Sequence, residues 1–190
     1  RYLLQRKIIE PIVLTTERKK TMLLPLDEMK EKAHAFYSGL GFTLTDDNID
    51  LAVQSLTMPC YANEFHAKYG VEIQNHASLA TVGDAYWTAY ILFITFTPQS
   101  SKSELTNLKQ VIATNAYMDR LAKKWLKPFL FASNNDLTQN DKETGNAKGY
   151  ATALEAVIGF LFLEYPTSVF DFLKSKFPIE KLIEIMNFFL

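Results

Sequence analysis

The sequence predicts an all-α domain with an N-terminal extension. Apolar residues recur every three or four positions, as Ile49, Val53 and Leu56 do, which is the spacing of one helix face. Residues that favour helix starts, and glycines or prolines that favour helix ends, bracket these stretches. With 48% hydrophobic and 22% charged residues, the 190-residue chain can also bury a sizeable core.

The expected helices follow one another from residue 27 onward. Asp27 is placed to cap the first, and Thr45, Asp46 and Asp47 to cap the second, because their side-chain oxygens accept hydrogen bonds from the free N–H groups of a first turn. Ser103 is placed to cap a later helix in the same way. The predicted helices span residues 27–38, 45–58, 76–96, 103–116, 117–124 and 150–164, and further helices begin at Pro166 and Pro178.

Three stretches lack a helical pattern. Residues 61–75 are predicted to form a loop with at most one helical turn. Residues 133–149 are polar and poor in apolar side chains, which favours a mobile loop. Residues 1–44 form the predicted extension, in which 8–14 suits a strand or an extended arm because Pro11 is unfavourable inside a helix. The domain itself is predicted to span residues 45–190.

The composition argues against several classes of protein. The formal net charge is -1, so any surface that binds nucleic acid must be a local patch. Cys60 is the single cysteine, which rules out a disulfide within the chain and favours a reducing intracellular compartment, the cytoplasm or an organelle. The longest apolar run, around residues 89–96, is too short to cross a bilayer, so we expect no membrane partner.

Two carboxylates stand in similar apolar surroundings, far apart in the sequence. Asp84 lies in LATVGDAYW, and Glu155 lies in YATALEAVIG. Burying an ionised carboxylate is costly unless something compensates its charge, so the pair suggests a shared cation. Position 80 lies four residues before Asp84 and position 152 three residues before Glu155, so each pair shares one helix face.

Four segments resemble the motifs of the ribonuclease III family, in the same order and with the same spacing. LAVQSLTMPCYANE at 51–64 resembles the family's ALTHRSYANE segment, and NHASLATVGDA at 75–85 resembles NERLEFLGDA. Residues 114–124 resemble the SNKNLA helix, and residues 150–163 resemble DxFEALIGALYL. The resemblance implies the all-α fold of the ribonuclease III endonuclease domain.

The chain departs from the family at two of its four acidic positions. Ala80 stands in place of a glutamate and Thr152 in place of an aspartate, whereas Asp84 and Glu155 are retained. The Mini-III branch of the family resembles this pattern closely, with LAYLGDA and Y(A/S)TxFEALIGYLYL motifs. That branch is active, so the resemblance implies that two carboxylates can suffice.

The resemblance implies a homodimeric, metal-dependent endoribonuclease that hydrolyses double-stranded or hairpin RNA during RNA processing. Asp84 and Glu155 would be catalytic and would bind Mg²⁺, with Mn²⁺ as a substitute, because Mg²⁺ accepts one or two carboxylates and keeps several waters. Thr152, Ala80 and Asn115 would support this site. The expected contacts to RNA phosphates come from Lys148, Lys123, Lys124 and Lys109.

The same residues allow other interpretations. A catalytically inactive module of this fold would bind RNA or a protein partner structurally, and the two missing carboxylates and the near-neutral charge favour it. A heterodimer half completed by a partner chain is a third option. Taken singly, Asp84 fits an ion pair with a lysine and Glu155 fits an exposed helix position. The aromatic residues Tyr86, Trp87 and Tyr90 suit either a dimer surface or the core of one chain.

Overall fold

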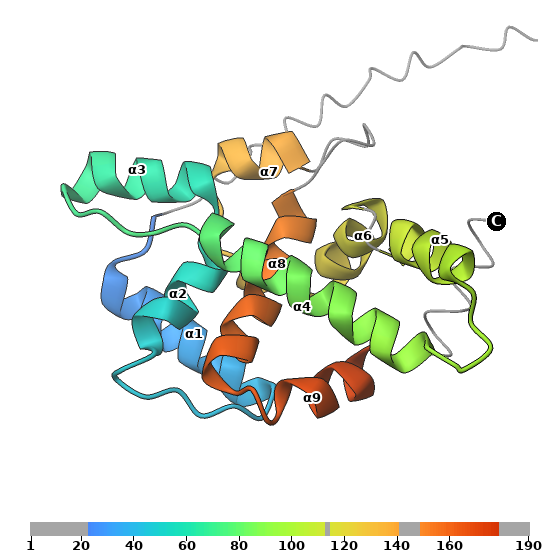
Figure 1. Ribbon diagram of the computed structural model, residues 1–190. Helices are drawn as coiled ribbons and strands as arrows, with labels where there is room; N and C mark the ends of the chain where they lie inside the picture. Colours follow the sequence, from blue (N-terminus) through green and yellow to red (C-terminus); the bar gives the residue numbers. More distant parts are fainter. Residues whose placement is uncertain (1–22, 113–114, 141–148, 179–190) are drawn as a thin grey trace, which may run out of the picture.

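The computed structural model describes residues 23–112, 115–140 and 149–178, and these residues are almost entirely helical (Figure 1). Within these ranges the single β-type pairing is an isolated parallel bridge between Thr57 and Phe131. The all-α prediction is therefore confirmed. The elements are α1 (Leu26–Gly39), α2 (Ile49–Leu56), α3 (Pro59–Tyr69), α4 (Ala77–Thr95), α5 (Lys102–Ile112), α6 (Asn115–Trp125), the 3₁₀ turn η1 (Lys127–Phe129), α7 (Asn134–Asn140), α8 (Gly149–Glu164) and α9 (Val169–Lys176).

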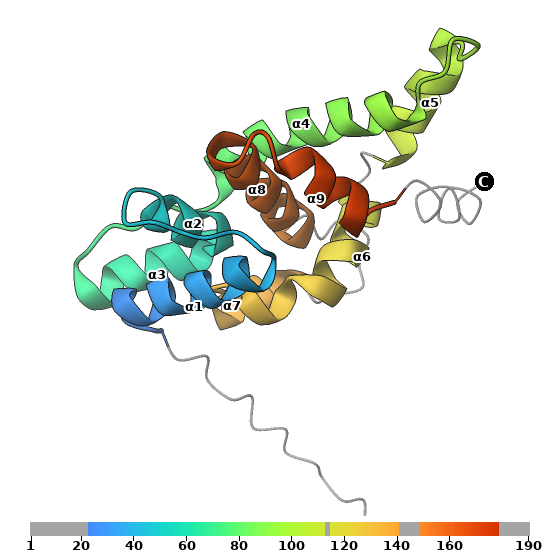
Figure 2. The ribbon, with the colours of Figure 1, turned by 90° about the horizontal axis from the view of Figure 1, so that it is seen from below.

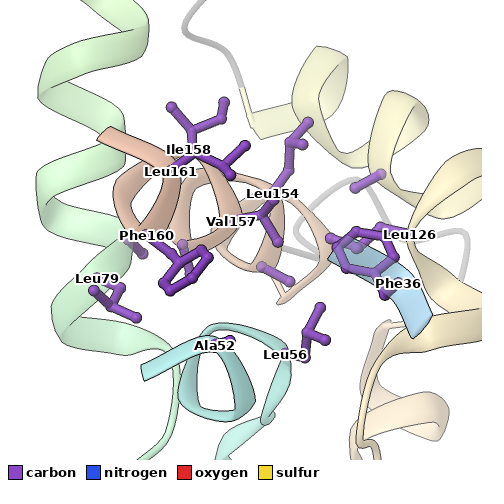
Figure 3. Packing of buried hydrophobic residues seen from close by; sticks show 14 of the residues in the cluster. Phe36, Ala52, Leu56, Leu79, Leu126, Leu154, Val157, Ile158, Phe160 and Leu161 are labelled. Carbon is purple, nitrogen blue, oxygen red and sulfur yellow. The ribbon is translucent and has the colours of Figure 1, made fainter. Parts of the chain in front are cut away.

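Helix α8 runs through the middle of the domain. Its residues from Tyr150 to Leu161 are buried, apart from Thr152 and Glu155. A helix that is apolar on nearly every side needs neighbours all around it, and α8 packs against α4, α6 and α2. Figure 3 shows its side chains pointing outward among the surrounding helices, with Leu79 of α4 on one side and Leu56 of α2 on another.

Helix α1 lies within the segment that was predicted as an extension, and it packs into the same hydrophobic core. Its buried residues include Phe36 and Tyr37. The Tyr37 ring lies 4.6 Å from the Phe160 ring of α8, and its hydroxyl forms a 2.5 Å hydrogen bond with Ser55 Oγ. Burial raises the pKa of Tyr37 well above its ordinary value.

The prediction of a loop at residues 61–75 is wrong for its first half, which belongs to α3. Pro59 occupies the first turn of α3, where the backbone N–H that proline lacks would have no partner within the helix. It can therefore begin this helix. Tyr61, Ala62 and Phe65 form its buried side. The helix ends at Gly70, whose φ of +67° is readily adopted only by glycine.

The predicted loop at 133–149 also contains a helix, α7. The Ser133 hydroxyl accepts hydrogen bonds from the N–H groups of Asn135 and Asp136, which caps its first turn. Asp136 is buried, and its carboxylate reaches the start of α3, where it accepts hydrogen bonds from Cys60 N–H at 3.1 Å and Tyr61 N–H at 2.9 Å. Residues 141–148 lie outside the described part of the chain.

Four predicted helix starts are corrected by the structure. Helix α2 begins at Ile49, after Asn48, and not at residue 45, and helix α9 begins at Val169 and not at Pro166. Helix α5 is capped by Ser101 instead of Ser103: Ser101 Oγ accepts from Glu104 N–H, and Glu104 Oε2 accepts from Ser101 N–H. Helix α1 begins one residue before Asp27, which lies in its first turn. The predicted arm at 8–14 and the helix expected from Pro178 fall outside the described residues. In the described ranges, none of the helices has the length and apolar character needed to cross a membrane.

Candidate active site

Helices α4 and α8 touch through their backbones at two glycines. A Cβ atom on Gly83 would clash with the backbone carbonyl of Glu155 and lie 2.8 Å from Gly159 N. A Cβ atom on Gly159 would in turn clash with the carbonyl of Leu79. Only residues without a side chain allow so close an approach, so the two glycines determine where the helices cross (Figure 1).

The crossing brings together the two carboxylates that the sequence singled out. Asp84 follows Gly83 on α4 and is exposed, whereas Glu155 provides the backbone carbonyl at the crossing and has a half-buried side chain. Burial, and then the charge of Asp84, raises the pKa of Glu155 to about 7. Asp84 is therefore near enough to Glu155 for its charge to act on that carboxylate.

Two of the predicted supporting residues lie on the same helices. Ala80 is one turn before Asp84 and is buried, so it adds no polar atom to the site. Thr152 is half-buried, and between Tyr150 and Leu161 it and Glu155 are the two residues of α8 that are not buried. Asn115 is the first residue of α6, but its side chain lies outside the described part of the structure.

The chemistry of these donors suits Mg²⁺ better than a softer metal. Among the described residues, no group of three or more histidine, cysteine, aspartate or glutamate side chains is placed to hold a metal. Zinc sites use three or four such ligands, whereas Mg²⁺ takes one or two carboxylates and completes its shell with water and phosphate oxygens. Asp84 and Glu155 therefore match the donor set of a magnesium site.

His76, which precedes α4, is held in its neutral form by burial. Its side chain is 2% exposed, and burial lowers its pKa to about 4. Neither ring nitrogen has a hydrogen-bond partner among the described atoms. A neutral histidine in this environment is a packing residue of the core.

Two of the four predicted RNA-contacting lysines have described side chains, and these two lie on different helices. Lys109 is exposed on α5 and lines the same groove as Phe93 of α4 and Phe96, the residue that follows α4. Lys123 is half-buried, and its Nζ lies 5.8 Å from the centre of the Tyr150 ring. The Lys124 side chain and all of Lys148 lie outside the described residues.

The aromatic residues of α4 divide between the core and the surface in a way the sequence left open. Trp87 and Tyr90 are buried, and the Tyr90 hydroxyl donates a hydrogen bond to the Phe177 carbonyl at 3.1 Å. Tyr86 is half-buried and stacks on Phe162 at 4.4 Å. Two of the three candidates for a dimer surface are therefore core residues of a single chain.

Replacing Glu155 by glutamine should stabilise the metal-free protein at high pH. The folded-state pKa of about 7 lies above the ordinary value of 4.5, so folding is favoured while Glu155 is protonated and weakened as pH rises through 7. With allowance for solvent screening we expect about 1–2 kcal/mol at pH 8, or roughly 2–8 °C in Tm, falling toward zero near pH 5. Thermal unfolding in EDTA at pH 5 and pH 8 measures this, and an equal Tm difference at both values would contradict it.

Comparisons with known proteins agree with the fold. Residues 77–166, which include α4 and α8 with both carboxylates, match the family model of the ribonuclease III domain. The fold is similar to the nuclease domain of ribonuclease III from Campylobacter jejuni, with a TM-score of 0.54 and 23% identity over 81% of this chain and 95% of that one. That structure is described for flexibility in a region involved in dimer formation. No curated protein sequence matches the chain. Residues 77–166 are therefore similar to the ribonuclease III domain, and the fold of the chain is that of a ribonuclease III nuclease domain.

Proposed function

We propose that the protein is a metal-dependent endoribonuclease that cleaves double-stranded or hairpin RNA. The observation that carries this proposal is the crossing of α4 and α8, inside the ribonuclease III match, where the charge of Asp84 acts on Glu155. That charge disfavours the ionised form of Glu155. A bound divalent cation would favour it.

In this proposal Asp84 and Glu155 hold Mg²⁺, which when bound polarises the scissile phosphate and lowers the pKa of the attacking water. Glu155 must first release the proton that its raised pKa favours, so cation binding should strengthen as pH rises through about 7 and level off above it. Asp84 is exposed, so it would be the ligand that is open to the substrate. Thr152, one turn before Glu155, would hold a water near the cation, and Ala80 would add no ligand of its own.

The proposed substrate and assembly follow from the family. Double-stranded RNA is recognised through its phosphates and 2′-hydroxyl groups, so basic side chains on several elements must contribute. The near-neutral net charge of -1 makes one chain a weak RNA binder, and a homodimer doubles its basic surface. Sedimentation of the free protein tests the dimer independently of cleavage.

Cleavage of a long, perfectly paired, end-labelled RNA in Mg²⁺ tests the activity. The wild type should cut, leaving 5′-phosphate and 3′-hydroxyl ends, and EDTA should stop it. Asp84→Asn and Glu155→Gln should each reduce the rate at least ~10²-fold, since each removes charge from the site that stabilises the transition state. The matched control is Glu164→Gln, an exposed position at the end of the same helix α8, which should cut like the wild type.

A second readout does not depend on activity. A cation that binds only the native state raises its stability by about 2.7 kcal/mol at 100 times its Kd. Mg²⁺ or Mn²⁺ should therefore raise the Tm of the wild type and of Glu164→Gln, but not of the variant that carries both Asp84→Asn and Glu155→Gln.

A catalytically inactive module of the same fold is the second candidate. The observation that favours it is that positions 80 and 152 carry no carboxylate. The residue at the first of these positions, Ala80, is buried. Such a module would give no cleavage with either cation and no cation-dependent rise in Tm. That pair of results would replace the proposal of an enzyme with that of a structural subunit.

A further inference from the structure

The side chain of Asn140 joins the end of α7 to the start of α8. Its Oδ1 atom accepts a hydrogen bond from Gly149 N–H at 2.8 Å, and its Nδ2 group donates one to the Asp136 carbonyl, also at 2.8 Å. Asn140 is buried. Because the amide has an acceptor at one end and donors at the other, these two bonds are satisfied together in a single orientation of the side chain.

Gly149 makes room for this amide. A Cβ atom on Gly149 would clash with the side-chain amide of Asn140. Gly149 is the first residue of α8, so its N–H belongs to the first turn, where backbone donors have no acceptor within their own helix. Asn140 therefore supplies an acceptor from a different helix to the start of α8.

The first turns of α8 also carry the side chains of the proposed cation site. Thr152 and Glu155 follow Gly149 by three and six residues, which is ~4.5 Å and ~9 Å along the helix axis. The close contact with α4 holds α8 farther along, at Glu155 and Gly159. Figure 2 shows α8 between α4 and α7. Thr152 thus lies between two points at which α8 is held, the contact with α4 and the bond to Asn140.

Helix α7 is a firm support for this bond because it is tied to α3. The Asp136 carboxylate accepts hydrogen bonds from the Cys60 and Tyr61 N–H groups at the start of α3. The start of α4 is fixed to the same part of the molecule, since His76 N–H donates to the carbonyl of Thr57, two residues before α3, at 2.9 Å. The two helices that carry the carboxylates therefore begin from one hydrogen-bonded base.

We propose that Asn140 is a positioning residue for the cation site, because its bond to Gly149 fixes the first turn of α8 and with it Thr152 and Glu155. This inference rests on the proposed function, since it concerns how that site holds its cation. Asn140 acts through the backbone of Gly149 and is not itself a ligand. Mg²⁺ demands near-ideal octahedral geometry, so its affinity is sensitive to small displacements of the groups around it.

A cap that served stability alone would give a different result. Its loss would lower Tm but leave the cation affinity of the folded molecules unchanged. Ser133→Ala is the matched control, because the Ser133 hydroxyl accepts hydrogen bonds from Asn135 and Asp136 N–H at the opposite end of α7. It should lower Tm as Asn140→Ala does, while the bond between Asn140 and Gly149 remains.

The Kd for Mn²⁺, measured well below Tm by electron paramagnetic resonance of the free ion, separates the two roles. Asn140→Ala should weaken Mn²⁺ binding at least ~5-fold, which is toward the lower end of the effects seen when groups that support metal ligands are removed. Ser133→Ala should stay within ~2-fold of the wild type, since distant sites without a shared partner act independently.

Gly149→Ala tests the same contact from the other side. Its added methyl group should displace the Asn140 amide and weaken Mn²⁺ binding by a similar factor. In the Asn140→Ala background the same substitution should add less than ~2-fold, because no amide is left to displace. Independent effects of the two substitutions would contradict a role that depends on their contact.

Hydrogen exchange of the metal-free protein separates failure of this inference from failure of the proposed function. Asn140→Ala should speed exchange of the backbone amides of residues 150–155 more than Ser133→Ala does, because the start of α8 is then released. Equal exchange in the two variants would overturn the positioning role, and so would wild-type Mn²⁺ affinity in Asn140→Ala. A wild type that binds no Mn²⁺ would instead overturn the proposed cation site itself, and the role of Asn140 toward it as well.

Discussion

Replacing Gly83 by alanine should destabilise the protein by at least about 3 kcal/mol, although alanine normally favours a helix by about 1 kcal/mol over glycine. The added methyl group would meet the backbone of Glu155 and Gly159, and a helix backbone cannot move aside as a flexible side chain can. The helices α4 and α8 must then separate along their whole contact, which opens the centre of the core. We expect Tm to fall by roughly 6–12 °C.

The same substitution at Gly39 is the matched control. Gly39 is also helical, at the end of α1, but a Cβ atom there would meet nothing within 4 Å. Gly39→Ala should therefore be neutral or slightly stabilising. If Gly83→Ala folds, its separated helices should also weaken the effect of Mg²⁺ on Tm. Equal stability of the two variants would mean that α4 and α8 do not touch at Gly83.

Replacing Asp136 by alanine should cost about 3–5 kcal/mol of folding stability. Its carboxylate is buried and accepts hydrogen bonds from three backbone N–H groups, those of Cys60, Tyr61 and Ser133. Removing the carboxylate leaves these donors without an acceptor, and two of them are in the first turn of α3. Asp136→Asn should lose nearly as much, because both carboxylate oxygens are used and asparagine has only one.

Urea unfolding measures this loss as a fall in the midpoint with an unchanged slope. Asp171→Ala is the control: Asp171 is also in the first turn of a helix, α9, but is exposed. That variant should lie within about 1 kcal/mol of the wild type, the size of a helix-dipole contribution at the surface. A loss of the same size at Asp136 would show that its buried hydrogen bonds contribute little.

The parts of the fold that local sequence patterns predicted well are the long apolar helices. Helices α4 and α8 were expected at 76–96 and 150–164 and lie at Ala77–Thr95 and Gly149–Glu164. Their apolar stretches are long enough to identify a helix without knowledge of its neighbours. The helices α3 and α7 were missed because they are short, largely polar, and joined through Asp136, a contact between residues 75 or more positions apart.

The candidate site shows the same division. The carboxylates of Asp84 and Glu155, and the small residues around them, were recognisable as a pattern in the chain. Their unequal burial was not, because it depends on how α4 crosses α8. The role of Trp87 and Tyr90 was equally undecided, since an aromatic residue on a helix suits a core or an interface until its neighbours are known.

By itself, then, the sequence determined the helical class, the two central helices and the pair of carboxylates, because these depend on local periodicity and residue type. The tertiary structure decided that Gly83 and Gly159 place the carboxylates together, that Asp136 joins α7 to α3, and that Phe93 and Phe96 remain exposed. Each of these outcomes depends on which segments become neighbours. The free energy of that packing arises from contacts between segments, so the sequence of one segment alone does not predict it.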